Sequence, residues 1–155
     1  MILNISIALS IFLFTSYCSP SGDFVDFELK YADVQGVKVS GDEGSYAFSV
    51  TISSPDKGCS QYADWWEVVS ESGELIYRRI LAHSHVSEQP FTRSGGKISV
   101  LKNQKVWVRA HMNNAGYGGI VMKGNVTDGF AVDTMPDDFA MNLETEKPLP
   151  GSCAF

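Results

Sequence analysis

Short segments in which apolar and polar residues alternate run through most of the chain from residue 32 onward. In one of them the apolar side chains of Tyr46, Phe48, Val50 and Ile52 alternate with smaller or polar ones. A period of two places successive side chains on opposite faces of a strand, so the pattern predicts strands with one buried face. The other expected strands cover residues 34–39, 63–69, 75–81, 97–101, 105–112 and 119–125.

Seven short strands within residues 32–127 are typical of an all-β fold, an immunoglobulin- or fibronectin III-like antiparallel β-sandwich. A closed barrel is the alternative. In the sandwich the third strand pairs with both the fourth and the sixth, antiparallel to each. Gly36 interrupts the first strand and predicts a bulge there. With 44% hydrophobic and 19% charged residues, the chain has the composition of a folded domain.

The first 18 residues have the character of an export signal. Residues 2–14 are uncharged and mostly apolar, a run too short to cross a bilayer, which takes about 20 residues. The residues around Cys18 resemble the lipobox of bacterial lipoproteins, in which the cysteine becomes the lipidated first residue; ordinary cleavage after Cys18 is the alternative. With a linker over residues 19–31, this predicts an exported protein, a periplasmic or outer-membrane lipoprotein that contacts the membrane only through its anchor.

Two cysteines remain when Cys18 is set aside, and both lie in the expected exported part. An even pair in an oxidising compartment forms a disulfide, so we expect Cys59 to be bonded to Cys153. A metal-binding thiolate at Cys59 is the alternative.

The C-terminal region, residues 128–155, is an acidic tail. It carries six acidic residues, one basic residue and three prolines, and is therefore expected to be a solvated extension held by Cys153, with a cation-binding segment as the alternative. The net charge of the whole chain is -6, which argues against a nucleic-acid partner because phosphate binding needs clustered Lys and Arg.

The three histidines fall at strand ends that the sandwich brings to the same end of one sheet. His83-x-His85 places two imidazoles on one side of an extended segment, and His111 ends the sixth strand. With Asp64 as a further ligand, the three predict a copper or zinc site. Hydrogen bonding of the histidines to the loop 86–90 is the alternative.

The outer face of the same sheet is expected to carry large side chains. If Val106, Val108 and Ala110 face the core, then Trp107, Arg109 and His111 face outward, as do Trp65 and Glu67 on the third strand. This predicts a Glu67–Arg109 pair and a surface formed by Trp65, Glu67, Trp107 and Arg109 that contacts a protein or a glycan. Coverage by loops or by the acidic tail is the alternative.

Several segments together resemble a family of small exported bacterial proteins of unassigned function. They are Tyr62–Val69, with its Tyr-Ala-Asp and Trp-Glu-Val motifs, His83-Ser84-His85, and Glu88–Arg93, with the motif Glu-Gln-Pro-Phe-Thr-Arg. The resemblance covers about residues 32–126 and implies a sandwich. It supplies no activity, and Cys59, the acidic tail and Cys153 depart from it.

No catalytic motif is present: the chain lacks Gly-x-Ser-x-Gly, His-Glu-x-x-His, a P-loop and a dinucleotide fingerprint. We therefore do not expect an enzyme. The sequence leaves two hypotheses, an exported lipid-anchored protein with a copper or zinc site, and a metal-free module that contacts a protein or glycan.

Overall fold

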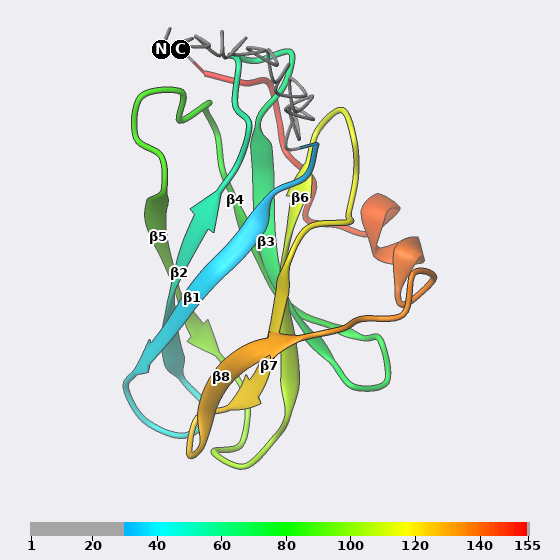
Figure 1. The fold of residues 1–155 in the computed structure, drawn as a ribbon. Helices are drawn as coiled ribbons and strands as arrows, with labels where there is room; N and C mark the ends of the chain where they lie inside the picture. The colour runs from blue at the N-terminus through cyan, green and yellow to red at the C-terminus, as the bar shows by residue number, and fades with distance from the viewer. Residues whose placement is uncertain (1–29, 155) are drawn as a thin grey trace, which may run out of the picture.

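Two antiparallel sheets pack face to face in the computed structural model, which describes residues 30–154 (Figure 1). The first sheet has the order β1-β2-β5 and the second the order β4-β3-β6-β7-β8. The expected signal at residues 1–18 and nearly all of the linker lie outside the described residues. The eight strands are β1 (Asp33–Ser40), β2 (Tyr46–Ser53), β3 (Ala63–Ser70), β4 (Leu75–Ile80), β5 (Phe91–Ile98), β6 (Val106–Met112), β7 (Val121–Asn125) and β8 (Gly129–Asp133).

The all-β antiparallel sandwich expected from the sequence is confirmed, with eight strands rather than seven. β2 shows the strict alternation of buried and half-buried residues that its sequence predicts. Its apolar residues form the core between the sheets together with Trp66 and Val68 of β3 and Val106 and Val108 of β6. A register shift between Val34 and Gly36 confirms the bulge in β1.

β5 begins earlier than the sequence predicts. The expected strand covered residues 97–101, whereas the observed strand covers Phe91–Ile98 and contains Ser94-Gly95-Gly96, a run with the composition of a turn. The reason is a tertiary contact, since a Cβ on Gly95 would lie 2.5 Å from the Tyr77 hydroxyl. Gly95 is therefore the place where a tyrosine from the facing sheet packs onto the strand.

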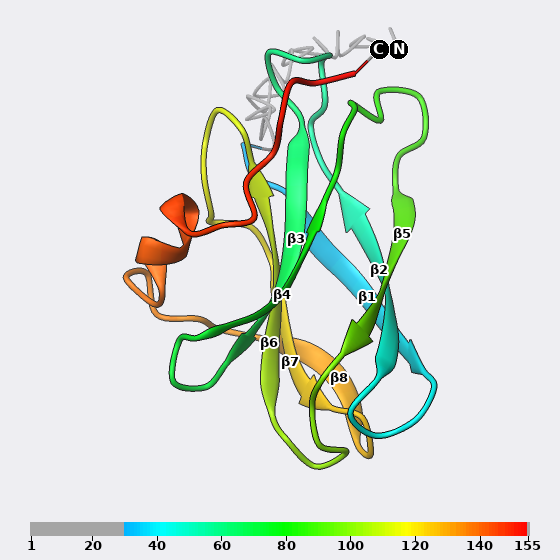
Figure 2. The same ribbon diagram turned by 180° about the vertical axis from the view of Figure 1, so that it is seen from behind.

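The C-terminal region also differs from the expected solvated extension. Residues 129–133 form β8, which pairs with β7 and extends the sheet. The C-terminal segment, residues 134–154, then crosses the outer face of the five-stranded sheet through a short 3-10 helix, η1 (Met141–Thr145) (Figures 1 and 2). Leu143 of η1 packs in a second apolar cluster with Val69 and Trp107. The tail is therefore part of the domain.

The expected disulfide between Cys59 and Cys153 is present, with sulfurs 1.96 Å apart. It joins the end of the C-terminal segment to the loop before β3, 94 residues earlier in the chain. Across residues 30–154, we find no helix of the length and apolar character needed to cross a membrane.

Candidate functional site

The outer face of β3 and β6 carries the side chains that the sequence assigns to it. The cross-strand register places Glu67 of β3 opposite Arg109 of β6 on one side and opposite Arg78 of β4 on the other. The Glu67 carboxylate accepts hydrogen bonds from both guanidinium groups. Its Oε1 lies 2.8 Å from Arg109 Nε, and its Oε2 lies 2.6 Å from Arg78 Nη2. The predicted Glu67–Arg109 pair is confirmed, and Arg78 completes a three-residue cluster that we call the arginine clasp.

The arginine clasp holds the C-terminal segment through backbone carbonyls. Arg78 donates to the carbonyl oxygens of Leu143, Glu146 and Pro148, and Arg109 to those of Phe139 and Ala140. Each guanidinium also stacks on an aromatic ring, Arg78 on Trp65 at 4.5 Å and Arg109 on Tyr117 at 3.6 Å. Buried charges are tolerated only when they are paired and hydrogen-bonded, and the clasp with its carbonyls meets that condition.

Trp65 and Trp107 are therefore not the exposed contact surface that the sequence predicts. Both face outward, as expected, but only 2% and 5% of their surfaces are exposed. Leu143 and Phe139 of the C-terminal segment pack on Trp107, whereas the side chains of His111, Arg78 and Tyr117 lie against Trp65. Glu67 and Arg109 are equally buried. The open contact surface expected from these four residues is therefore not found, and coverage, the alternative given with it, is what the structure shows.

His111 lies beneath the same segment and has partners at both ring nitrogens. Its Nδ1 is 2.6 Å from Asp64 Oδ1, its Nε2 is 3.2 Å from Glu144 Oε1, and its ring stacks on Trp65 at a centroid distance of 3.6 Å. Burial raises the pKa of Asp64, although the hydrogen bond to His111 acts in the opposite direction. His111 therefore serves to connect β3 and β6 to η1.

His85 has a different environment. It is 2% exposed and stacks on Phe91 at 3.8 Å, and its ring centroid is 4.5 Å from that of His83. Within the described part of the chain, neither of its ring nitrogens has a hydrogen-bond partner. Burial, with the nearby positive charge of Arg93, lowers the pKa of His85. Its backbone N–H donates to Asp56 Oδ2 at 2.7 Å. The carboxylate oxygen Asp56 Oδ2 lies 3.9 Å from His85 Nδ1, so His85 is a buried imidazole beside a carboxylate to which its ring forms no hydrogen bond.

The structure does not assemble the metal set of His83, His85, His111 and Asp64. Among residues 30–154, no group of three or more His, Cys, Asp or Glu side chains is arranged to hold a metal ion. The ring nitrogens of His111 are occupied by two carboxylates, whereas His83 and His85 lie together in the other environment. Any metal site must therefore have fewer protein ligands than the four that the sequence predicts.

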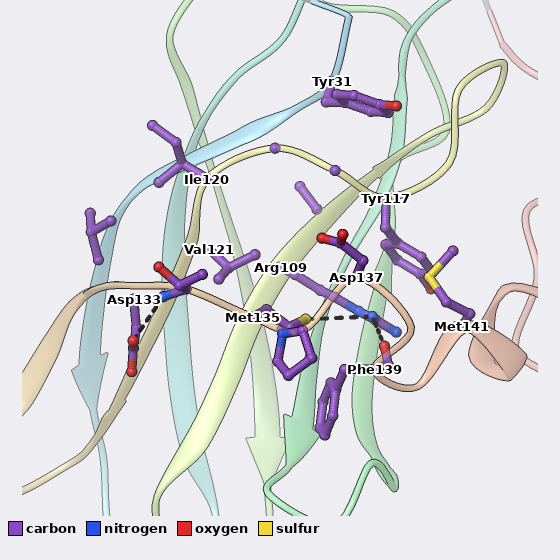
Figure 3. Close-up of a pocket in the computed structure, with 16 residues that line it drawn as sticks. Tyr31, Arg109, Tyr117, Ile120, Val121, Asp133, Met135, Asp137, Phe139 and Met141 are labelled. Atoms are coloured by element: carbon purple, nitrogen blue, oxygen red, sulfur yellow. Dashed lines mark hydrogen bonds between the residues drawn. The ribbon is translucent and has the colours of Figure 1, made fainter.

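A pocket of about 630 Å³ opens between the outer sheet face and the C-terminal segment (Figure 3). Its walls come from β6, from the connection between β6 and β7, and from the loop between β8 and η1. Arg109 and Tyr117 lie at its inner side, and burial raises the pKa of the Tyr117 hydroxyl, which therefore stays protonated at neutral pH. A volume of this size is within the range of small-molecule sites.

Sequence reasoning missed Arg78, Glu144 and the pocket. Arg78 could have been found, because a glutamate in the middle of a central strand has a cross-strand neighbour on each side, and β4 offers an arginine in register. Glu144 and the pocket depend on the path of the C-terminal segment. That path is set by hydrogen bonds to backbone carbonyls, which every residue type possesses.

Comparison with known proteins identifies one relevant relative. The chain is 39% identical over 106 residues to a protein of Halomicrobium mukohataei described as "Putative lipoprotein". The match covers 67% of this chain and 52% of the relative, so the chain spans about half the length of the curated relative that it matches. No family model matches the chain, and no solved structure matches it.

Proposed function

We propose that the protein is an exported lipoprotein, a β-sandwich held at a membrane surface by a lipid on Cys18. The observation that carries this proposal is the Cys59–Cys153 disulfide, because such bonds persist in oxidising compartments outside the cytoplasm. The similarity to a relative described as a lipoprotein supports it further. So does the apolar run at residues 2–14, which is followed within a few residues by Cys18.

Replacement of the lipidated cysteine tests the anchor directly. The full chain is expressed in a host with a lipoprotein pathway and compared with Cys18→Ala by membrane fractionation and by mass spectrometry of the N-terminal peptide. We expect the unchanged chain in the membrane fraction with a lipid mass on Cys18, and the variant in the soluble exported fraction. Fractionation also shows which membrane carries the protein.

The double variant Cys59→Ser/Cys153→Ser is the matched control, because it removes two other cysteines and should leave the anchor unchanged. A mature N-terminus at Ser19, without a lipid, would show ordinary signal cleavage and refute the anchor.

A second candidate function is the binding of copper or zinc at His83 and His85. The specific observation in its favour is a buried imidazole without hydrogen-bond partners whose ring lies 4.5 Å from that of a second histidine. Buried polar atoms are nearly always satisfied, so unpaired nitrogens at one place need an explanation. Neutral imidazole is the ligand form that Cu²⁺ and Zn²⁺ require, and burial keeps His85 neutral. Water would complete the coordination.

Metal titration of the untagged protein separates the histidines. We expect uptake of about one equivalent of Cu²⁺ or Zn²⁺, lost in His83→Ala and in His85→Phe, since two imidazoles supply the protein ligands. Phenylalanine at position 85 preserves the stacking on Phe91. His111→Gln is the control and should bind metal normally. Uptake unaffected by His85→Phe, or no uptake at all, would contradict the site.

A further inference from the structure

Exposed apolar side chains gather at the pocket beside the C-terminal segment. Of the six large hydrophobic residues that are exposed in the described part of the chain, three line this pocket: Ile120, Val132 and Met141. Their exposed fractions are 47%, 66% and 39%. Exposed apolar surface that lines a concavity is typical of a binding site, because an occupant would remove it from water.

The charges that remain uncompensated at this pocket are negative. Arg109 is the arginine at its inner side, but Glu67 neutralises it. Its donors are bonded to the carbonyl of Phe139, as Figure 3 shows, and to that of Ala140. Asp133 ends β8 and accepts a hydrogen bond from the backbone N–H of Thr134, Asp137 lies on the loop that follows, and neither forms an ion pair within residues 30–154.

One further charge of each sign lies at the edge of the pocket. Asp33 accepts a hydrogen bond from the backbone of Ile120, at 2.7 Å. The ammonium group of Lys30 lies 4.9 Å from the centre of the Tyr31 ring. The balance of unpaired charge around the pocket therefore favours a positively charged occupant.

The chain's own preceding segment is a poor occupant. Residues 23–29 lead to Tyr31, which lines the pocket, and include the apolar Phe24 and Phe27. The same seven residues contain Asp23, Asp26 and Glu28, however, and these carboxylates would be placed against Asp133 and Asp137. Like charges at short distance repel, so the charge of these seven residues does not match that of the pocket.

We propose that this pocket binds a small molecule with an apolar body and a protonated amine. The apolar body would cover Ile120, Val132 and Met141, and the ammonium group would lie between Asp133 at the end of β8 and Asp137 on the loop that follows. The inference does not depend on the lipid anchor or on a metal, because neither contributes a residue to this pocket.

The proposal is tested on the full mature chain with three probes that share the same phenol ring and differ in net charge. They are tyramine, which is cationic, tyrosol, which is neutral, and 4-hydroxyphenylacetate, which is anionic. Ligand-observed NMR should show saturable binding of tyramine at least about tenfold tighter than that of tyrosol, since two carboxylates contribute, and no binding of the anion.

Asparagine substitutions then assign the site. The double variant Asp133→Asn/Asp137→Asn should bind tyramine no better than tyrosol. Asp42→Asn, on the turn between β1 and β2, removes a carboxylate elsewhere and should leave tyramine binding unchanged. Equal binding of tyramine and tyrosol to the unchanged protein overturns the proposal, as does the absence of saturable tyramine binding up to about 10 mM. Retention of the preference in the double variant overturns it as well.

Discussion

Glu67 is the residue on which the arginine clasp depends. Its carboxylate is fully buried and is shared by two guanidinium groups, and within residues 30–154 it is the one carboxylate to which Arg78 or Arg109 donates a hydrogen bond. Breaking a buried pair by removing one partner leaves an uncompensated charge, which is far more costly than losing an exposed ion pair. The energetic importance of the clasp therefore lies in its central carboxylate.

Glu67→Gln tests this point at constant side-chain size. We expect the variant to lose about 3–5 kcal/mol of unfolding free energy, measured by urea denaturation, because both arginines stay buried without a counter-charge. Glu71→Gln is the matched control, since Glu71 forms an exposed ion pair with Lys123 and should change stability little. Equal effects of the two substitutions would show that the clasp contributes no more than a surface pair.

His85 predicts a pH dependence of stability. Its folded pKa lies below the ordinary value of 6.5, so the unfolded chain takes up a proton at a higher pH than the folded protein. The stability that His85 contributes is therefore present above pH 6.5 and is lost as the pH falls toward the folded pKa.

The measurement compares urea denaturation of the unchanged protein with that of His85→Phe at several pH values between about 5 and 8. We expect the unchanged protein to lose stability relative to the variant on acidification. A difference that stays constant over this range would show that His85 titrates equally in both states.

At the scale of elements, the strands that alternate clearly could be predicted, and those governed by contacts could not. β2, β3 and β6 were expected at nearly their observed positions, because one face of each packs in the core. β5 was misplaced, because Ser94-Gly95-Gly96 does not look like part of a strand and the packing of Tyr77 on Gly95 that explains the glycine is a long-range contact. In β5, tertiary packing therefore outweighs the local preference of these residues for a turn.

The two adjacent glycines of β5 allow a controlled test. A Cβ at Gly95 would overlap the Tyr77 ring, with its hydroxyl 2.5 Å away, whereas the nearest atom to a Cβ at Gly96 is at 3.9 Å. We expect Gly95→Ala to destabilise the protein by about 1–3 kcal/mol through overpacking, and Gly96→Ala to change stability by less than about 1 kcal/mol. Thermal and urea denaturation would check both. A larger loss in Gly96→Ala would mean that the Tyr77 contact does not govern this strand.

The part of the candidate site that lies on strands could be predicted from the sequence, and the part formed by the C-terminal segment could not. The outward faces of β3 and β6 follow from alternation, and so does the Glu67–Arg109 pair. The alternation does not predict which segment covers those faces. The C-terminal segment is acidic and contains prolines, which indicates solvation, yet its attachment uses carbonyl oxygens and one buried side chain, Leu143. For this reason the exposure expected for Trp65 and Trp107 is not observed.

For the whole molecule, two attachments of the C-terminal segment differ in kind, and they act beside the His111–Glu144 hydrogen bond and the packing of Leu143. The Cys59–Cys153 disulfide fixes its end, and the arginine clasp fixes its middle through five hydrogen bonds from Arg78 and Arg109 to carbonyl oxygens. A disulfide acts mainly by restricting the unfolded chain, whereas hydrogen bonds act in the folded state. The two attachments should therefore respond differently to removal.

Cys59→Ser/Cys153→Ser should lower the unfolding free energy by about 4.7 kcal/mol, the cost expected for a crosslink that closes a loop of this length. The folded segment should nevertheless stay in place, because the clasp still binds it. Hydrogen exchange should show the amides of Leu143 and Glu146, which donate to the carbonyls of Ala140 and Leu143, still protected relative to global unfolding. Adding Glu67→Gln should remove that protection, since the clasp then carries uncompensated charge. If the segment lost protection in the cysteine variant alone, the disulfide rather than the clasp would be what holds it against Trp65 and Trp107.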